Sequence, residues 1–237
     1  MSSGIYTAAA GAVAQSNALD VTASNIANAT TSGFRGARVT FRQALATAQS
    51  VDTALVGTST GAVDAQNGAI TQTGNPLDVA INGDGFFSVD TTRGVRYTRD
   101  GSFQLGTDGT LVTADGNHVR GQNGAAIAIP QGSAQVAIDA DGTVRADGNE
   151  VGKLELVHLD RNALTHDADN LVASKKAPLG GTPPTLISGA IEGSNVNVVR
   201  GVVDLVKVSR TYESLVRVIE GYHECESRAA QTLGAPK

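Results

Sequence analysis

The sequence predicts a mainly β middle domain flanked by long N- and C-terminal α-helices that pair as a coiled-coil-like assembly layer. Two observations lead to this prediction: apolar residues recur every seven positions near both ends, and Asn-Gly or Asp-Gly steps crowd the middle. We expect four segments, namely an N-terminal helix and turn at 1–34, a connector at 35–74, a β-rich domain at 75–188 and a C-terminal helix at 189–237.

The N-terminal segment carries a heptad series of apolar residues. The series is Ile5, Ala12, Leu19 and Ile26, with alanines at the alternate seam positions. We expect the helix to begin at Ser2 or Ser3, whose hydroxyl can cap free amides, and to end near Asn28. Gly33 is the predicted left-handed residue that closes this helix, and Phe34 is its apolar contact.

The connector shows weaker signals. Phe41 to Ala48 indicates a short helical or mixed stretch, whereas residues 50–66 are rich in Thr, Ser, Gly and Ala and are expected to be extended.

The middle of the chain has the composition of a hairpin-rich β domain. Nine Asn-Gly or Asp-Gly steps lie between Asn67 and Gly148, and none occurs elsewhere. Such steps supply the positive φ angles of tight turns, so the apolar or alternating runs between them are predicted strands. The expected strands are 79–81, 86–89, 95–98, 102–105, 111–113, 126–129, 136–138 and 153–159.

The C-terminal segment repeats apolar residues in steps of four and three. The stripe is Val198, Val202, Leu205, Ser209, Tyr212, Val216 and Ile219. A helix of roughly 36 residues is about 54 Å long, more than a compact domain of this size covers. For either end alone, an amphipathic helix lying on its own domain is the alternative. A stripe at both ends favours packing between helices, within or between subunits.

An Asn-rich phrase stands at the inner boundary of each predicted helix. Asn25 and Asn28 lie three apart on one helix face, where their amides can bond a neighbouring helix or simply help to end their own. Asn195 and Asn197 occupy the corresponding place before the second helix. The candidate assembly residues are therefore Ile5, Ala12, Leu19, Asn25, Ile26, Asn28, Asn195, Asn197, Val198, Val202, Leu205, Tyr212, Val216 and Ile219.

Charge and hydropathy exclude several classes of partner. The net charge is −5 and the near-neutral ends leave the acidic excess to residues 61–188, so we expect no nucleic-acid partner. No run approaches the ~18 apolar residues of a membrane span, and no membrane insertion is expected. The first basic residue is Arg35, which argues against a cleavable signal peptide.

No catalytic, metal or cofactor residues are predicted. Asp139 and Asp141 resemble part of a calcium loop, but the remaining ligands of an EF-hand are absent. His223, Glu224 and Cys225 are adjacent on a predicted helix and point in different directions, so they cannot converge on one ligand. We therefore expect a protein that is not an enzyme.

Four phrases together resemble the axial family of rod and hook proteins of the bacterial flagellum. They are SNIANATTSGFR at 24–35, GNPLDVAINGDGFF at 74–87, YTRDGSF at 97–103 and EGSNVN at 192–197. The resemblance implies a structural subunit of the basal-body rod, whose terminal helices form an inner layer around an export channel with the β domain outside.

The resemblance also implies partners and a location. These are other rod subunits, including the distal rod protein and the inner rod proteins, the type III export apparatus of the flagellum, and a final place in the periplasmic rod. The modest connector is similar to that of proximal rod members, with a distal rod or hook-type subunit as the alternative. A secreted β-domain enzyme or binding module with helical oligomerisation arms is the alternative from another class, and an aromatic content of 4% counts against it.

Overall fold

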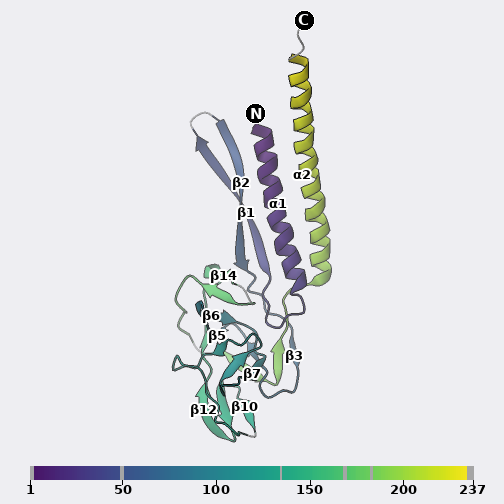
Figure 1. The fold of residues 1–237 in the computed structure, drawn as a ribbon. Helices are drawn as coiled ribbons and strands as arrows, with labels where there is room; N and C mark the ends of the chain where they lie inside the picture. Colours follow the sequence, from purple (N-terminus) through teal and green to yellow (C-terminus); the bar gives the residue numbers. More distant parts are fainter. Residues whose placement is uncertain (1–2, 49–50, 134, 168–169, 182–183, 234–237) are drawn as a thin grey trace. The chain divides into compact units, whose positions relative to one another are not determined.

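The computed structural model describes residues 3–48, 51–133, 135–167, 170–181 and 184–233 (Figure 1). It contains the predicted N-terminal helix, mainly β middle region and C-terminal helix. Two compact units are present: unit 1 comprises Met1–Ala27, Arg38–Thr60 and Asn197–Lys237, and unit 2 comprises Asn28–Ala37 and Gly61–Val196. None of the helices within the described ranges is both long and apolar enough to cross a membrane.

Unit 1 contains the two long helices, which lie side by side in Figure 1. Helix α1 spans Ser3–Ala27 and helix α2 spans Val198–Leu233, close to the predicted bounds. The expected caps at Ser2 and the Ser3 side chain lie outside the described part of the chain. Buried alanines line α1, and their small side chains allow close helix approach; they are Ala8, Ala12, Ala14 and Ala18.

Most of a two-stranded hairpin also belongs to unit 1. Strand β1 spans Ala37–Ala48 and pairs with strand β2, Val51–Val63. The predicted helical or mixed stretch from Phe41 to Ala48 is therefore wrong. Pairing with β2 overrides the helix propensity of the alanine-containing end of this segment.

Unit 2 consists of short antiparallel strands. They are β3 Ile70–Gln72, β4 Val79–Asn82, β5 Phe86–Thr91, β6 Gly94–Thr98, β7 Phe103–Leu105, β8 Leu111–Thr113, β9 His118–Val119, β10 Val136–Ile138, β11 Thr143–Ala146, β12 Asn149–Lys153, β13 Leu156–Val157, β14 Leu164–His166, β15 Val172–Ser174, β16 Thr185–Ser188 and β17 Ala190–Glu192. The largest sheet has the order β14-β15-β6-β5-β9-β8-β7, with β13 paired to β5. Smaller sheets are β10-β11-β12, β16-β4 and β17-β3.

The turn-based prediction of strands is largely confirmed. Positive φ angles occur at seven of the nine predicted turn glycines, and the exceptions are Gly68 and Gly101. The run 126–129 forms only isolated bridges, and the predicted strand 153–159 is reduced to the end of β12 and to β13. Several strands of two to four residues were missed because such short segments show no alternating pattern.

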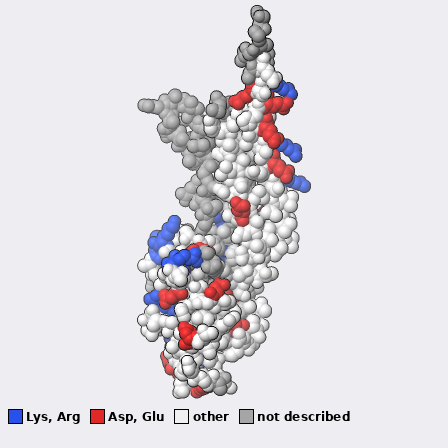
Figure 2. Space-filling view, viewed as in Figure 1, with Lys and Arg blue, Asp and Glu red and all other residues white. Residues whose placement is uncertain are grey.

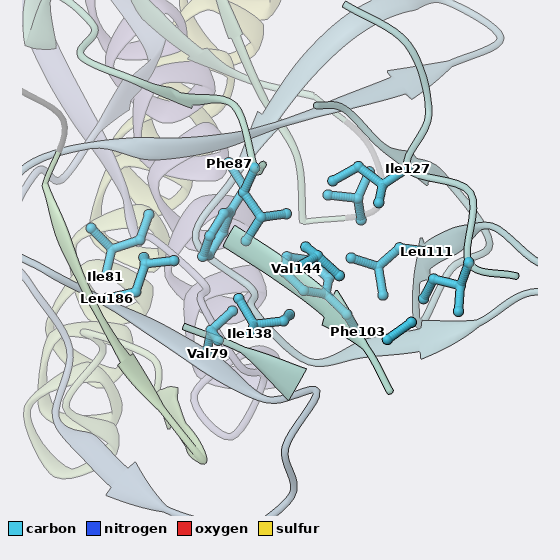
Figure 3. Packing of buried hydrophobic residues seen from close by; sticks show 13 residues of the cluster. Val79, Ile81, Phe87, Phe103, Leu111, Ile127, Ile138, Val144 and Leu186 are labelled. Carbon is cyan, nitrogen blue, oxygen red and sulfur yellow. The ribbon is translucent and has the colours of Figure 1, made fainter. Parts of the chain in front are cut away.

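One continuous apolar cluster forms the main core of unit 2 (Figure 3). Phe87 and Phe103 meet edge to face with ring centroids 5.1 Å apart, and Val144 lies among the buried side chains of the same cluster. A second cluster includes Phe86, Leu159 and Leu164. The middle region therefore has its own core.

The last two strands return to the beginning of unit 2. Leu186 of β16 pairs with Ile81 of β4, and Glu192 at the end of β17 pairs with Ile70 of β3. This return places the Glu192 carboxylate beside segments that are far away in the sequence.

Candidate assembly site

Helices α1 and α2 pack antiparallel along a shared seam in unit 1. The close approaches are Gly4 to Tyr222, Gly11 to Leu215 and Ile26 to Gly201. A Cβ atom at Gly201 would lie 2.9 Å from Ile26, so this glycine lets the backbone of α2 approach α1 closely. The contacting glycines Gly4 and Gly11 each lie one position before a residue of the predicted series, Ile5 and Ala12.

The candidate residues of the two helices differ in burial, and Ile26 is the one that contacts a seam glycine, Gly201. Ala12 is buried, and the half-buried candidates are Ile5, Leu19, Asn25, Ile26, Leu205, Tyr212, Val216 and Ile219. Leu19 and Leu205 also line an open groove of about 420 Å³ between the two helices. Val198 and Val202 differ, because each is 45% exposed.

The beginning of α2 carries an apolar stripe that the chain itself leaves exposed. The stripe consists of Val199, Val202, Val203 and Val206, spaced three and four residues apart and therefore on one face. Val199 is 76% exposed and Val203 62%. In the view of Figure 2, charged side chains gather toward the C-terminal end of α2, whereas its beginning is mostly uncharged. We call these four residues the valine stripe.

Two of the Asn candidates, Asn28 and Asn197, make local bonds. The backbone N–H of Arg200 donates to Asn197 Oδ1 at 3.0 Å, so Asn197 is the N-cap of α2. In unit 2, the Asn28 side chain accepts a hydrogen bond from the Thr31 hydroxyl at 3.2 Å. For Asn28 this contact agrees with the interpretation that it helps to end the helix.

Asn195 joins three segments of unit 2. Its side-chain oxygen accepts from the Gly36 N–H at 2.8 Å, and its Nδ2 donates to the carbonyls of Asp64 and Gln66. The backbone N–H of Asn195 donates to the Phe34 carbonyl at 3.3 Å. This residue therefore fixes the chain just before α2 against the phrase that follows α1.

A buried ion network in unit 2, which we call the arginine–glutamate triad, was not predicted. Arg35 Nη2 lies 2.7 Å from Glu192 Oε1, and Arg99 Nη1 lies 2.9 Å from Glu192 Oε2. All three side chains are at most 3% exposed. One carboxylate thus binds two guanidinium groups away from water, with one more positive than negative charge.

Backbone groups complete the triad. The Gly68 N–H donates to Glu192 Oε1 at 2.7 Å, and Arg99 Nη2 donates to the Gly83 carbonyl at 2.7 Å. A Cβ at Gly68 would lie 2.0 Å from the Gly193 carbonyl oxygen, so only glycine fits here. Burial lowers the pKa of Arg35 to about 10, against the opposing effect of Glu192, and it also lowers the pKa of Arg99.

Gly33 has a different role from the predicted one. It is left-handed, with φ 65°, but α1 ends at Ala27, so the predicted closure of the helix by Gly33 is wrong. Its N–H donates instead to the Glu192 carbonyl at 2.7 Å, and a Cβ would lie 2.1 Å from the Asp100 nitrogen. Phe34 packs on the His166 ring of the same unit, with 5.7 Å between the ring centroids.

The triad draws together three phrases of the sequence resemblance. Arg35 ends the first phrase, Arg99 lies in the third and Glu192 opens the fourth. The sequence did contain one hint of the triad, because each of these apolar or glycine-rich phrases includes one of its charged residues. Sequence alone could not pair them, because nothing local specifies a contact between residues so far apart.

The aspartates that resembled a calcium loop are used in turns and ion pairs. Asp141 accepts from the Thr143 N–H at 3.1 Å and from its hydroxyl at 2.9 Å, which lowers the Asp141 pKa to about 2. Asp139 pairs with Arg145 at 2.6 Å. Within the described ranges, no group of three or more His, Cys, Asp or Glu side chains is placed to hold a metal ion.

Three family models match separate parts of the chain. Residues 5–35 match the flagella basal body rod protein model, residues 80–146 match the flagellar hook protein FlgE/F/G D1 domain, and residues 187–232 match the flagellar basal body rod FlgEFG protein C-terminal model. The matches include both long helices and the central β region.

Relatives match the chain over most of its length. The flagellar basal-body rod protein FlgF of Salmonella typhimurium is 37% identical, over 98% of this chain and 99% of the relative. FlgF of Rhizobium meliloti is 30% identical over all of both chains. The flagellar basal-body rod protein FlgG of Bacillus subtilis is 34% identical over 85% of this chain and 88% of the relative.

Proposed function

The chain belongs to the flagellar basal-body rod protein family, and we propose that it is an FlgF-type structural subunit whose terminal helices polymerise in the rod. Its relatives are structural rod proteins rather than enzymes, and the same holds for this chain. The observation that carries the proposal is full-length identity of 37% to an FlgF protein, spanning both helices and the β unit.

The seam and the valine stripe have different roles in this proposal. The seam holds α1 against α2 within one subunit, in a coiled-coil-like pair. The valine stripe offers apolar side chains that the chain does not cover, and helices of neighbouring subunits bury them on assembly. The candidate residues Val198 and Val202 lie on the exposed side of α2, and Leu205, Tyr212, Val216 and Ile219 serve the seam.

The partners are other components of the rod, and the location is the flagellar basal body. In more detail, we propose contacts with the distal rod protein and the inner rod proteins, passage through the flagellar export apparatus, and a place in the periplasmic part of the rod. Segment 1–34 and segment 189–237 then form the assembly layer, and 75–188 lies outside it, joined by the connector at 35–74.

An FlgG-type distal rod subunit is the second candidate, because FlgG relatives are 33–34% identical over 85–95% of the chain. Gold labelling distinguishes the candidates when an epitope is inserted at the exposed Asp147–Gly148 turn of unit 2. Basal bodies isolated from complemented cells should carry label on the rod, near its cell-proximal end for an FlgF-type subunit. Label spread along the distal rod would favour the FlgG-type role, and label absent from basal bodies would contradict both.

A further inference from the structure

Three Asn-Gly steps occur in the chain, and all of them lie in unit 2. They are Asn67–Gly68, Asn82–Gly83 and Asn123–Gly124. In such a step the backbone nitrogen of the glycine can attack Cγ of the asparagine, because glycine has no side chain to hinder the approach. The hydrogen bonds of these two groups, the glycine N–H and the asparagine amide, therefore distinguish the three steps.

The step at Asn67 is held by the arginine–glutamate triad. Arg35 Nη2 donates to Asn67 Oδ1 at 3.1 Å. The Gly68 N–H donates to Glu192 Oε1 at 2.7 Å, a short hydrogen bond to a charged acceptor. Attack at Asn67 Cγ requires the Gly68 nitrogen to leave the Glu192 carboxylate, so the triad protects this step.

The step at Asn123 is held by a tight turn. The Ala125 N–H donates to Asn123 Oδ1 at 3.1 Å. The Gly124 N–H donates to the Gly121 carbonyl at 2.8 Å. The tetrapeptide Gln-Asn-Gly-Ala at 122–125 is the same as that at 66–69. The steps at Asn67 and Asn123 therefore share one local sequence, and in both of them the two reactive groups are bound.

The step at Asn82 lacks both of these bonds. Asn82 ends β4 and is the exposed residue of that strand. Among the described residues, none accepts a hydrogen bond from the Gly83 N–H and none bonds to the Asn82 side-chain amide. Gly83 has a φ of 103°, and nothing lies within 4 Å of the place that a Cβ would take. The chain at this peptide bond therefore has room to rotate until the Gly83 nitrogen reaches Asn82 Cγ.

We propose that Asn82 is a site of spontaneous deamidation in the folded protein. The Gly83 nitrogen forms a bond to Asn82 Cγ, and the bond from Cγ to Nδ2 breaks. The proton of the Gly83 N–H goes to the leaving nitrogen, so ammonia is released and a five-membered succinimide remains. Water then opens the ring at either carbonyl and returns a proton to the Gly83 nitrogen. The product is an aspartate or an isoaspartate at position 82.

The modification acts on the triad through the main chain. Both products add a negative charge, and the isoaspartate also adds one carbon to the main chain before Gly83. The Gly83 carbonyl accepts from Arg99 Nη2 at 2.7 Å, so the longer main chain displaces an acceptor of the triad. A buried donor that loses its acceptor destabilises the fold. The isoaspartate therefore weakens unit 2, and this inference does not depend on the rod assignment.

Peptide mass spectrometry after incubation of the full chain in neutral buffer tests the proposal. Fragment ions locate the mass increase to one asparagine, and the same chain in urea gives the rates without structure. In urea we expect Asn67 and Asn123 to react at equal rates, because their local sequences are the same. In the folded chain both should slow by at least about tenfold, since two hydrogen bonds must break, while Asn82 slows by less than about threefold. A folded rate at Asn82 no higher than that at Asn67 or Asn123 would overturn the proposal.

A matched pair of variants provides a second measurement. Asn82→Gln removes the site, because the longer glutamine side chain closes its six-membered ring far more slowly, and Asn123→Gln is the control. The folded Asn82→Gln chain should release little ammonia, whereas Asn123→Gln should deamidate like the parent. The isoaspartate form, separated by ion exchange, should unfold at a lower urea concentration than the unmodified chain. Undiminished ammonia release from Asn82→Gln would contradict the site, and equal urea midpoints would contradict its effect on the triad.

Discussion

The Glu192 carboxylate contacts the Arg35 guanidinium at 2.7 Å, although the two residues lie near opposite ends of the β unit in sequence. Arg99 occupies the second carboxylate oxygen, and the Gly33 N–H binds the Glu192 carbonyl. The segment that follows α1 and the segment that precedes α2 are thus fixed to the same glutamate within unit 2. The triad therefore fixes the two points at which the chain enters and leaves unit 2.

Neutralising Glu192 should destabilise unit 2 strongly. Glu192→Gln leaves two buried guanidinium groups without a counter-charge, and breaking a buried ion pair in this way costs about 3–5 kcal/mol. Urea unfolding of the full chain, followed by the amide NMR signals of the strands of unit 2, measures the change. Arg145→Gln is the control, because it breaks an exposed pair and should leave the midpoint unchanged. Similar midpoints for both variants would refute the structural role of the triad.

Gly101 should tolerate no side chain. A Cβ at Gly101 would lie 1.7 Å from the Val79 carbonyl oxygen, so Gly101→Ala must displace backbone in the main core. We expect a loss of at least about 3 kcal/mol in the free energy of unfolding. Gly180→Ala, where nothing lies within 4 Å, should change it by less than about 1 kcal/mol. The comparison fails if the two alanine variants unfold at the same denaturant concentration.

Asp100 should make unit 2 more stable in mild acid. Burial raises its pKa to about 6 from 3.8, so between these values the folded chain binds more protons than the unfolded chain. The stability contributed by the protonated form is complete below about pH 4 and is lost as the pH rises through about 6. Asp100→Asn should therefore be more stable than the parent at pH 7, by on the order of 3 kcal/mol, and equal to it at pH 4. A difference that does not depend on pH would exclude this titration.

Asn197 should act as a cap that serine can replace. Asn197→Ala removes the acceptor for the Arg200 N–H and should cost about 1 kcal/mol of helix stability, whereas Asn197→Ser should retain most of it. Circular dichroism during thermal unfolding and exchange of the first amides of α2 report the loss. If serine were no better than alanine, Asn197 would have a role other than capping.

Substitutions at the seam and at the valine stripe should have different effects, one on the free subunit and the other on assembly. Leu205→Asp places a carboxylate at the half-buried seam and should destabilise the helix pair of the free subunit. Val203→Asp, at a 62% exposed position, should leave the free subunit within about 0.5 kcal/mol of the parent yet abolish swimming in cells that depend on this gene. Val203→Thr keeps the side-chain shape and is the control. Normal motility with Val203→Asp would rule out the valine stripe as an assembly surface.

Local patterns allowed much of the fold to be predicted from sequence. The spacing of apolar residues placed α1 and α2 within a few residues of their observed ends, because helical periodicity is a property of consecutive residues. The Asn-Gly and Asp-Gly steps marked the β unit, because a positive φ angle is a local requirement that glycine meets at small cost. The family resemblance also rested on continuous phrases.

Only the tertiary structure decided which of these residues meet. Gly33 lies against Asp100 and not at the end of α1. Asn195 and Asn197 are only two residues apart, yet Asn195 bonds to Gly36 whereas Asn197 caps α2. It also separated the apolar residues of α2 into those that face α1 and those that remain exposed. Heptad spacing cannot make that distinction, because both groups recur at helical intervals. The triad likewise depends on tertiary contacts. Its ion pairs form only when the β-strands bring distant segments together and exclude water between them.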